Sequence, residues 1–257
     1  MNGKKIKIAL CLSGEPRNSM FSFPYIYESL IGLNDNLKKE YQIYEVDVYI
    51  HSWKNFRALP LYNPKVFSID WIEGESFFKE KYVSLRSLTN NFKTQKLLDQ
   101  IYEFSFNSTP LTNSFLMYLS MLKCFNLINT SYDVYIRGRF DLYFNSPFNI
   151  KFMLESIKNN EYDIFLPSFT KNKNNKELVL FNDQFAICNL KAAKHYFNAY
   201  NNIPNLIEET NSLNTHHWLT EYLIKSDLNI KSCTCPELDL VRSSKVITIY
   251  NTPYYEH

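Results

Sequence analysis

The sequence predicts a single three-layer α/β/α domain with a mostly parallel central sheet, and three observations carry this prediction. The chain has 257 residues, of which 45% are hydrophobic and 21% charged, so it can bury the core of one α/β domain of ordinary size. Short apolar runs rich in Val, Ile, Tyr and Phe are continuous rather than alternating, which is typical of strands buried on both faces. Segments with helical spacing of apolar residues lie between these runs, and such alternation favours parallel strands.

The predicted strands are these apolar runs. The four clearest cover residues 7–12, 46–51, 133–136 and 163–167, with further candidates at 181–189 and 246–250. The chain has only five glycines, and two of them follow predicted strands, so we expect these two to mark turns where the backbone geometry matters.

The predicted helices cover residues 23–37, 115–129, 191–200 and 217–225, where apolar residues recur at helical spacing. The polar stretch KNKNNKE at 171–177 has no apolar anchor and is predicted to be a mobile loop. Residues 67–102 carry no clear pattern.

Charge and cysteine content narrow the class of protein. Lys and Arg number 28 against 26 Asp and Glu, a net charge of +2, which is too balanced for a dedicated nucleic-acid binder. Five cysteines are an odd number scattered through apolar runs, which fits a reducing compartment.

No apolar run reaches the roughly 18–20 residues of a membrane span, and the early apolar run is too short for a signal peptide. We therefore expect a cytoplasmic protein, with peripheral membrane contact left open.

The first candidate motif is SGEPRN at residues 13–18, directly after the first predicted strand. Loops at the carboxyl ends of parallel strands are where α/β proteins bind ligands, and an arginine guanidinium suits a phosphate. Ser13, Gly14 and Arg17 are therefore candidate nucleotide-binding residues. The motif matches neither the dinucleotide-binding nor the Walker pattern, and the alternative is a tight turn with a surface arginine.

The second motif, DVYIHSW at residues 47–53, brings His51 and Trp53 to the end of the second predicted strand. A tryptophan beside polar groups can stack on a base or a sugar ring, so both residues are candidate ligand contacts. The alternative is that both side chains belong to the core.

The third motif, YDVYIRGRFD at residues 132–141, places Arg137, Arg139 and Asp141 at the end of an apolar strand. The arginine pair suits a diphosphate, and Asp141 suits a divalent metal ion or sugar hydroxyls. Burying three charged groups without a ligand would be costly, although an internal ion pair between Arg and Asp is the alternative.

The order of these motifs, followed by FNDQFAICN at 181–189, resembles that of bacterial and viral glycosyltransferases of the GT-A type. The similarity is closest to small enzymes of capsule and lipopolysaccharide synthesis that pair an SG-x-x-R start with an R-x-R-x-D core. The resemblance implies a GT-A-like fold in one domain, with a nucleotide-sugar-binding half at 1–145 and an acceptor-side half at 146–257.

The resemblance also implies roles for residues. Ser13, Gly14 and Arg17 would contact the nucleotide, and Arg139 to Asp141 would take the place of the family's Asp-x-Asp, which binds metal and diphosphate. The first Asp of that motif is Arg139 here. The diphosphate is then neutralised either by Mn²⁺ or Mg²⁺ held by Asp141 or by Arg139 itself.

On the acceptor side, GT-A enzymes supply a carboxylate near the sugar, and Asp183 is the first candidate for it. Glu221 is the second, because it lies four residues after His217 and so shares its face of a predicted helix. Arg242 is a candidate late phosphate ligand. The alternatives are a turn before a strand at Asp183 and a plain amphipathic helix at Glu221.

The predicted function is transfer of a sugar from a nucleotide-sugar donor to a glycan or lipid-linked glycan acceptor. A sugar nucleotidyltransferase is the first alternative, although a richer glycine loop and a triphosphate-binding lysine would be expected there. A non-catalytic nucleotide-sugar-binding module is the second.

Overall fold

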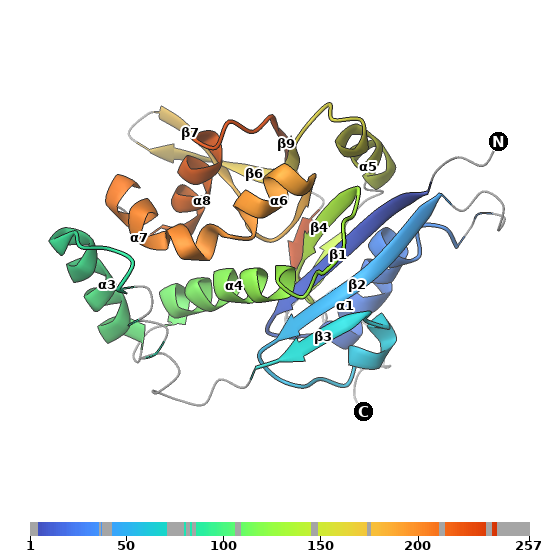
Figure 1. The fold of residues 1–257 in the computed structure, drawn as a ribbon, viewed down its shortest axis with the longest axis horizontal. Helices are drawn as coiled ribbons and strands as arrows, with labels where there is room; N and C mark the ends of the chain where they lie inside the picture. The colour runs from blue at the N-terminus through green and yellow to red at the C-terminus, as the bar shows by residue number, and fades with distance from the viewer. Residues whose placement is uncertain are drawn as a thin grey trace.

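The structure is a computed structural model that describes residues 5–35, 37, 43–70, 80, 83, 86–105, 109–144, 149–173, 176–210, 214–234 and 238–240. Its first half contains β1 (Ile6–Gly14), α1 (Ser19–Ile26), β2 (Tyr44–Ser52), β3 (Val66–Ile69), α3 (Phe92–Ser105), α4 (Thr109–Phe125), β4 (Val134–Gly138) and β5 (Leu142–Phe144). Its second half contains α5 (Ile150–Lys158), β6 (Ile164–Lys173), β7 (Lys176–Phe181), β8 (Ala186–Cys188), α6 (Leu190–Tyr196), α7 (Ala199–Thr210), α8 (Thr215–Ile224), β9 (Ile230–Thr234) and β10 (Leu238–Leu240). Figure 1 shows this arrangement.

One central sheet organises the molecule. Eight described strands form it, in the order β3-β2-β1-β4-β8-β6-β7, with β9 paired to β6. The pairs among β1, β2, β3 and β4 are parallel, and β9 is parallel to β6. β8 is antiparallel to both of its neighbours, β4 and β6, so these two point the same way. A separate short ladder joins β10 to β5.

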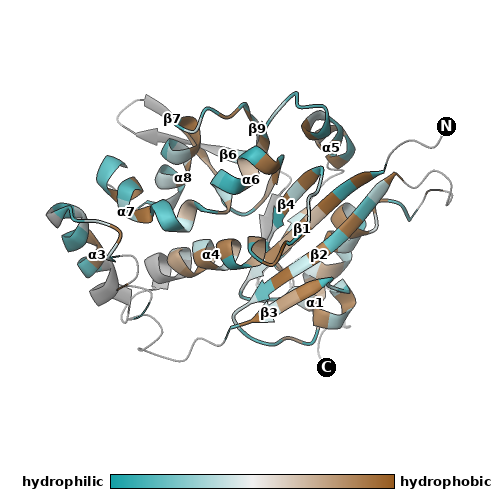
Figure 2. Cartoon of the chain, in the orientation of Figure 1, coloured by the Kyte–Doolittle hydropathy of each residue, from teal (hydrophilic) through white to brown (hydrophobic). Residues whose placement is uncertain are grey.

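Helices cover both faces of this sheet. Side chains alternate between the two faces along each strand, so neighbouring residues of one strand belong to different cores. On β1, Ala9 and Cys11 face a core formed with α3, α4, α6, α7 and α8, whereas Ile8, Leu10 and Leu12 face a core formed with α1 and α5. Both faces of β1 are thus apolar, as a sheet buried between two helical layers requires. Figure 2 shows the counterpart on the outside, where α6 and α7 carry many hydrophilic residues.

The predicted fold class is confirmed: the protein is a three-layer α/β domain with a mixed, mostly parallel sheet. The predicted strands at 7–12, 46–51, 133–136 and 163–167 correspond to β1, β2, β4 and β6. The segment predicted as one strand at 181–189 contains the end of β7 and all of β8, with a turn between them. The candidate strand at 246–250 lies outside the described residues, as does Arg242.

The predicted helices are present with shifted ends. The helix expected at 23–37 begins earlier, at Ser19, and its π-helical continuation ends at Ile31. Residues 191–200 belong to two successive helices, α6 and α7. None of the helices in the described part of the chain is both long enough and apolar enough to cross a membrane.

The loop prediction at 171–177 is wrong. β6 continues to Lys173 and β7 begins at Lys176, and the two strands pair antiparallel from Ser168 and Phe181 to Lys173 and Lys176. Backbone hydrogen bonds between neighbouring strands do not depend on apolar side chains, so a long polar hairpin gives no apolar signal in the sequence.

Gly138 ends β4 where the sheet approaches Leu12 closely. A Cβ atom at position 138 would stand 2.9 Å from Cδ2 of Leu12 and 3.4 Å from Cδ1 of Leu142. We predict that Gly138→Ala lowers the free energy of unfolding by about 1–3 kcal/mol through overpacking, as measured by urea denaturation.

The control for this prediction is Leu12→Val, which removes the nearest methyl group. In the double variant we expect a loss smaller than the sum of the two single losses by about 0.5 kcal/mol or more. Strictly additive losses would show that crowding against Leu12 is not the cause.

Candidate functional site

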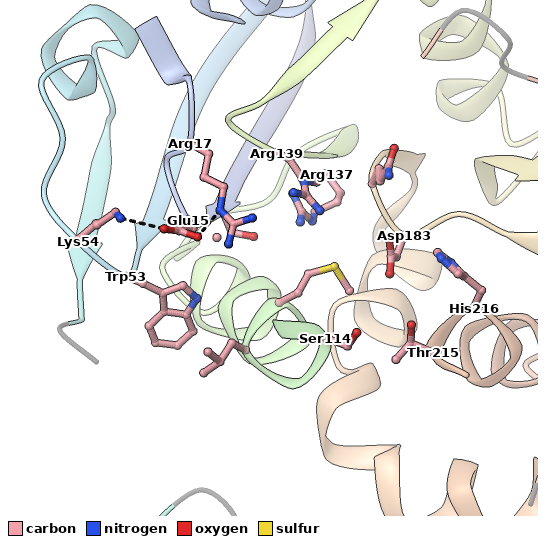
Figure 3. Close-up of a pocket in the computed structure, with 15 residues that line it drawn as sticks. Glu15, Arg17, Trp53, Lys54, Ser114, Arg137, Arg139, Asp183, Thr215 and His216 are labelled. Carbon is pink, nitrogen blue, oxygen red and sulfur yellow. Dashed lines mark hydrogen bonds and ion pairs between the residues drawn. The ribbon is translucent and has the colours of Figure 1, made fainter. Parts of the chain in front are cut away.

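A cavity of about 630 Å³ opens at the edge of the sheet where the parallel strands end (Figure 3). Three groups of residues line it: the ends of β1, β2 and β4 with the loops that follow them, the segment that leads into β8, and the helices α4 and α8. The residues are Ser13, Gly14, Glu15, Arg17, Trp53, Lys54, Ser114, Leu116, Met117, Arg137, Arg139, Asp183, Gln184, Thr215 and His216.

The topology of the sheet explains this position. From β1 the chain passes to β2 and β3 on one side and then returns to place β4 on the other side of β1. The strand order therefore reverses between β1 and β4, and the crevice outside their carboxyl ends is where open α/β sheets bind ligands. Leu12 pairs with Gly138 in the register of these two strands, so Ser13 and Arg139 leave the sheet side by side.

The antiparallel strand β8 brings further residues to the same edge. Because β8 runs against β4, its amino end lies at the carboxyl end of β4. Arg137 pairs with Ala186 in this ladder, which sets Asp183 and Gln184, just before β8, beside the residues that follow Arg137. The carboxylate of Asp183 thus faces the arginines from the other side of the crevice (Figure 3), and Gln184 also lines the cavity.

Arg137 is the most unusual residue of the cavity. Its side chain is 0% exposed, and none of its Nε, Nη1 and Nη2 atoms has a hydrogen-bond partner among the described residues. Burial lowers the pKa of its guanidinium below the ordinary value, and the nearby Arg139 lowers it further, whereas Tyr196 and Asp183 oppose the shift. A buried guanidinium without a partner is costly, and such a group requires an explanation outside the protein's own hydrogen bonds.

Ser13 adds a second unsatisfied group at this place. Its hydroxyl is buried and also lacks a partner within the described part of the chain. Gly14, which follows it and also lines the cavity, has φ of 116°, a conformation that favours glycine. The backbone and side chain of this loop therefore stand beside the arginines without closing the cavity.

Arg139 is held in place by Asp141. Nε and Nη2 of Arg139 donate to Oδ1 and Oδ2 of Asp141 at 2.8 and 2.9 Å, a two-pronged ion pair in which the carboxylate is 1% exposed. Burial alone would lower the pKa of Arg139, but the hydrogen bonds to Asp141 outweigh burial and raise it. This pair fixes the direction of the guanidinium.

A second charged group lies at the mouth of the cavity. Glu15 accepts from Lys54 at 2.8 Å and also pairs with Arg17. Burial would raise the pKa of Glu15, but the hydrogen bonds from Lys54 and Arg17 outweigh it and hold that pKa below its usual range. The pairing ties the loop after β1 to the loop after β2.

Asp183 differs from the other acidic residues of the cavity. It is 6% exposed, and no described donor makes a hydrogen bond to its carboxylate. Its backbone carbonyl accepts from the hydroxyl of Tyr196 at 3.2 Å, which anchors the turn before β8. The backbone of this turn thus holds Asp183 at the wall of the cavity.

Trp53 lines the cavity, whereas His51 lies beneath it. His51 is 0% exposed and contacts Ser120 at 2.7 Å and Asp70 at 3.2 Å through its two ring nitrogens. The rings of His51 and Trp53 meet edge to face at 4.7 Å, and Nζ of Lys123 lies 5.9 Å from the centre of the Trp53 ring. His51 therefore supports the wall of the cavity rather than forming its surface.

Most of the site residues predicted from the sequence meet at this cavity. Those that line it are Ser13, Gly14, Arg17, Trp53, Arg137, Arg139 and Asp183. His51, Asp141 and Glu221 are described but do not line it, and their expected contacts with ligand stay predictions. Glu221 lies on α8 with its carboxylate 3.8 Å from His217, as the spacing predicted, but the cavity is lined by the first turn of α8.

No sequence pattern identifies several of the other residues that line the cavity. Leu116 and Met117 on α4 fit the apolar spacing of a core helix, although they face the cavity. Thr215 and His216 are the first residues of α8, after the N-cap Asn214. Predicting that they line the cavity would have required knowing at which residue the helix begins. Nδ1 of His216 contacts the carbonyl of Phe181 at 3.2 Å.

The described donors do not fit a divalent metal ion at Asp141. Both of its oxygens accept from Arg139, and no group of three His, Cys, Asp or Glu residues suited to a metal ion occurs in the described ranges. The expected Mn²⁺ or Mg²⁺ stays an untested prediction, and no step below passes through a metal.

Comparisons with known proteins give low similarity throughout. No protein-family model matches the chain, and no curated protein matches it. Apo mouse xyloside xylosyltransferase 1 is similar with a TM-score of 0.44 and 12% identity, over 91% of this chain and 86% of that one. A CMP:2-keto-3-deoxy-manno-octonic acid synthetase complexed with CTP is similar with a TM-score of 0.46 and 8% identity, over 96% of each chain. Neither similarity assigns an activity to this chain.

The burial of His51 predicts how the stability of the protein depends on pH. Burial lowers its pKa to about 4, and Lys123 lowers it further while Asp70 opposes the shift. An unfolded histidine has a pKa of about 6.5, so the unfolded chain takes up the proton first, and stability present above pH ~6.5 is lost as the pH falls toward 4. From the pKa difference we expect His51 to contribute about 3 kcal/mol to this loss.

The measurement is the free energy of unfolding in urea between pH 7 and pH 4 for the wild type and for His51→Gln. Carboxylates that do not contact His51 contribute to acid sensitivity in both proteins and cancel in the difference. Asp70 does not cancel fully, because against the effect of burial its pKa is lowered chiefly by Lys123 and in part by His51. Parallel pH curves for the two proteins would contradict the prediction.

Proposed function

We propose that the protein is a glycosyltransferase that binds a nucleotide sugar in this cavity and transfers the sugar to a hydroxyl group of a glycan or lipid-linked acceptor. The observation that carries the proposal is the buried guanidinium of Arg137, which has no partner among the described residues and lies at the point where the strand order reverses. A phosphate group supplies the acceptor atoms that this guanidinium lacks.

The surroundings of Arg137 support a phosphate ester rather than a simple anion. Arg139, Arg17 and Lys54 line the same cavity and keep further N–H donors beyond those used in their ion pairs. Trp53 offers an apolar ring for a base or a sugar. The cavity volume of about 630 Å³ lies within the range of small-molecule and cofactor sites.

In the proposed reaction, an acceptor oxygen forms a bond to the anomeric carbon of the sugar as the bond from that carbon to the phosphate oxygen breaks. The electron pair of the broken bond leaves with the phosphate, and Arg137 and Arg139 stabilise the charge that develops there. The proton of the acceptor hydroxyl passes to the carboxylate of Asp183, which acts as general base. Asp183 is the candidate for this role because it lines the cavity and Glu221 does not.

The first test is a calorimetric and thermal-shift screen with UDP, GDP, CMP and dTDP and with their sugar conjugates. Selective stabilisation by one nucleotide sugar supports the proposal, because a ligand of the native state raises its melting temperature. Release of the nucleoside phosphate from that donor indicates an enzyme, whereas a binding module leaves the donor intact. Release of pyrophosphate from a nucleoside triphosphate and a sugar 1-phosphate would instead indicate a nucleotidyltransferase.

Arg137→Met tests the central observation. Without ligand we expect the variant to be as stable as the wild type or more stable, because an unpaired charge is replaced by an apolar side chain in the core. Its affinity for the nucleotide should fall by about tenfold or more, the value of a charged hydrogen bond. Urea denaturation and titration calorimetry measure the two quantities.

The matched control is Arg57→Met, since Arg57 is exposed and does not line the cavity. We expect this variant to bind the nucleotide like the wild type. If Arg137→Met destabilises the protein and keeps full affinity, Arg137 is a structural residue and the proposal loses its main support.

Asp183→Asn tests the base. The amide keeps the shape and one acceptor oxygen of the side chain but cannot take the proton, so we expect turnover to fall by about a hundredfold or more. The Kd of the donor should change by less than about threefold, the range expected when binding energy is retained. Equal turnover in the variant and the wild type would remove Asp183 from this role.

A further inference from the structure

We infer that the inner end of the cavity selects an uncharged sugar and excludes acidic sugars, such as uronic and keto-acid sugars, through the carboxylate of Asp183. This inference rests on the proposed function and names the class of sugar that the site accepts. We call the inner end the sugar end and define it as Ser114, Asp183, Gln184, Thr215 and His216. Figure 3 shows Asp183 in this group, facing Arg137 from the opposite side of the cavity.

The first argument is the distribution of cations. Arg17 and Lys54 both pair with Glu15, and Arg139 pairs with Asp141. Of the described cations that line the cavity, Arg137 is therefore the one without a carboxylate partner. Arg17 and Lys54 share the one carboxylate of Glu15, so a net positive charge also remains there, outside the sugar end. A phosphate is attracted to Arg137 and to this net charge, whereas the carboxylate of an acidic sugar would meet no described lysine or arginine within the sugar end.

The second argument is the chemistry of the sugar end. Ser114, Thr215, Gln184 and His216 carry hydroxyl, amide and imidazole groups, which pair with sugar hydroxyls as donors or acceptors. Asp183 supplies the only negative charge in this group, and an ionised carboxylate is an acceptor. The hydroxyl groups of a neutral sugar can donate hydrogen bonds to the carboxylate of Asp183 and exchange hydrogen bonds with the other groups of the sugar end.

The third argument is the burial of Asp183. At 6% exposure its charge is poorly screened by water, so a second carboxylate beside it would be repelled more strongly than at the protein surface. Asp183 attracts Arg137 and Arg139 but forms an ion pair with neither. Glu15, in contrast, makes direct ion pairs with Arg17 and Lys54, so the charge of Glu15 is the more fully compensated. Selection against a charged competitor by a placed like charge is a common route to specificity.

The experiment compares the Kd values of neutral and acidic sugars on the same nucleotide by titration calorimetry. The pairs are UDP-glucose with UDP-glucuronic acid and GDP-mannose with GDP-mannuronic acid, with UDP and GDP alone as references. In the wild type we expect the neutral sugar to bind at least about tenfold more tightly than the acidic one. In Asp183→Asn this ratio should fall by about threefold or more, while the Kd of the free nucleotide stays unchanged.

Glu28→Gln is the control, because it removes an exposed carboxylate that does not line the cavity and should leave the ratio between the two sugars unchanged. Equal binding of the two sugars by the wild type overturns the inference without need of any variant. So does selective binding of a CMP-linked acidic sugar, or an unchanged ratio in Asp183→Asn. Absence of binding by every nucleotide and nucleotide sugar overturns the proposed function itself, so the two failures are distinct.

Discussion

The sheet buries one costly group, the guanidinium of Arg137, at the end of β4, and the rest of the fold must offset that cost. An unpaired charge in a protein interior opposes folding, and the surrounding structure must offset it. Two apolar cores, one on each face of the sheet, supply that stabilisation, and the helices α4 and α6 pack against the face on which Arg137 lies. The fold thus holds a cation away from bulk water, where its attraction for an anion is stronger than at the protein surface.

The ends of the strands bring the residues around Arg137 together. Parallel strands β1, β2 and β4 end at one edge, and the antiparallel strand β8 begins there. Each strand end contributes a short polar segment, so groups far apart in the sequence meet within one crevice. Ion pairs then divide these groups into two kinds. Arg139 with Asp141, and Glu15 with Arg17 and Lys54, form direct ion pairs, whereas Arg137 and Asp183 form none within the described part of the chain and are the groups that we propose contact the ligand.

The sequence predicted the parts of this arrangement that depend on continuous apolar strands. β1, β2 and β4 each have an apolar pattern that ends in polar residues, and the predicted lining residues Ser13, Arg17, Trp53 and Arg137 follow from it. Asp183 was expected from the resemblance to GT-A enzymes rather than from a pattern. Met117 and His216 could not be predicted, because their positions depend on the rotation of α4 and on where α8 begins, and both are set by tertiary packing. The polar β6–β7 hairpin was missed for a related reason, since its strands pair through backbone groups that apolar patterns do not report.

The residues around Arg137 explain why its charge stays available. Cys11 pairs with Arg137 in the β1–β4 register, and Ala186 is its partner on the neighbouring strand β8. Burial raises the pKa of the Cys11 thiol, so at neutral pH it is protonated and does not pair with the guanidinium as an ion. A carboxylate at either position would stand beside the guanidinium and form an internal ion pair, as the carboxylate of Asp141 does with Arg139. A small neutral thiol and a methyl group occupy these positions instead, and the arrangement is the one expected if the guanidinium binds an anionic ligand.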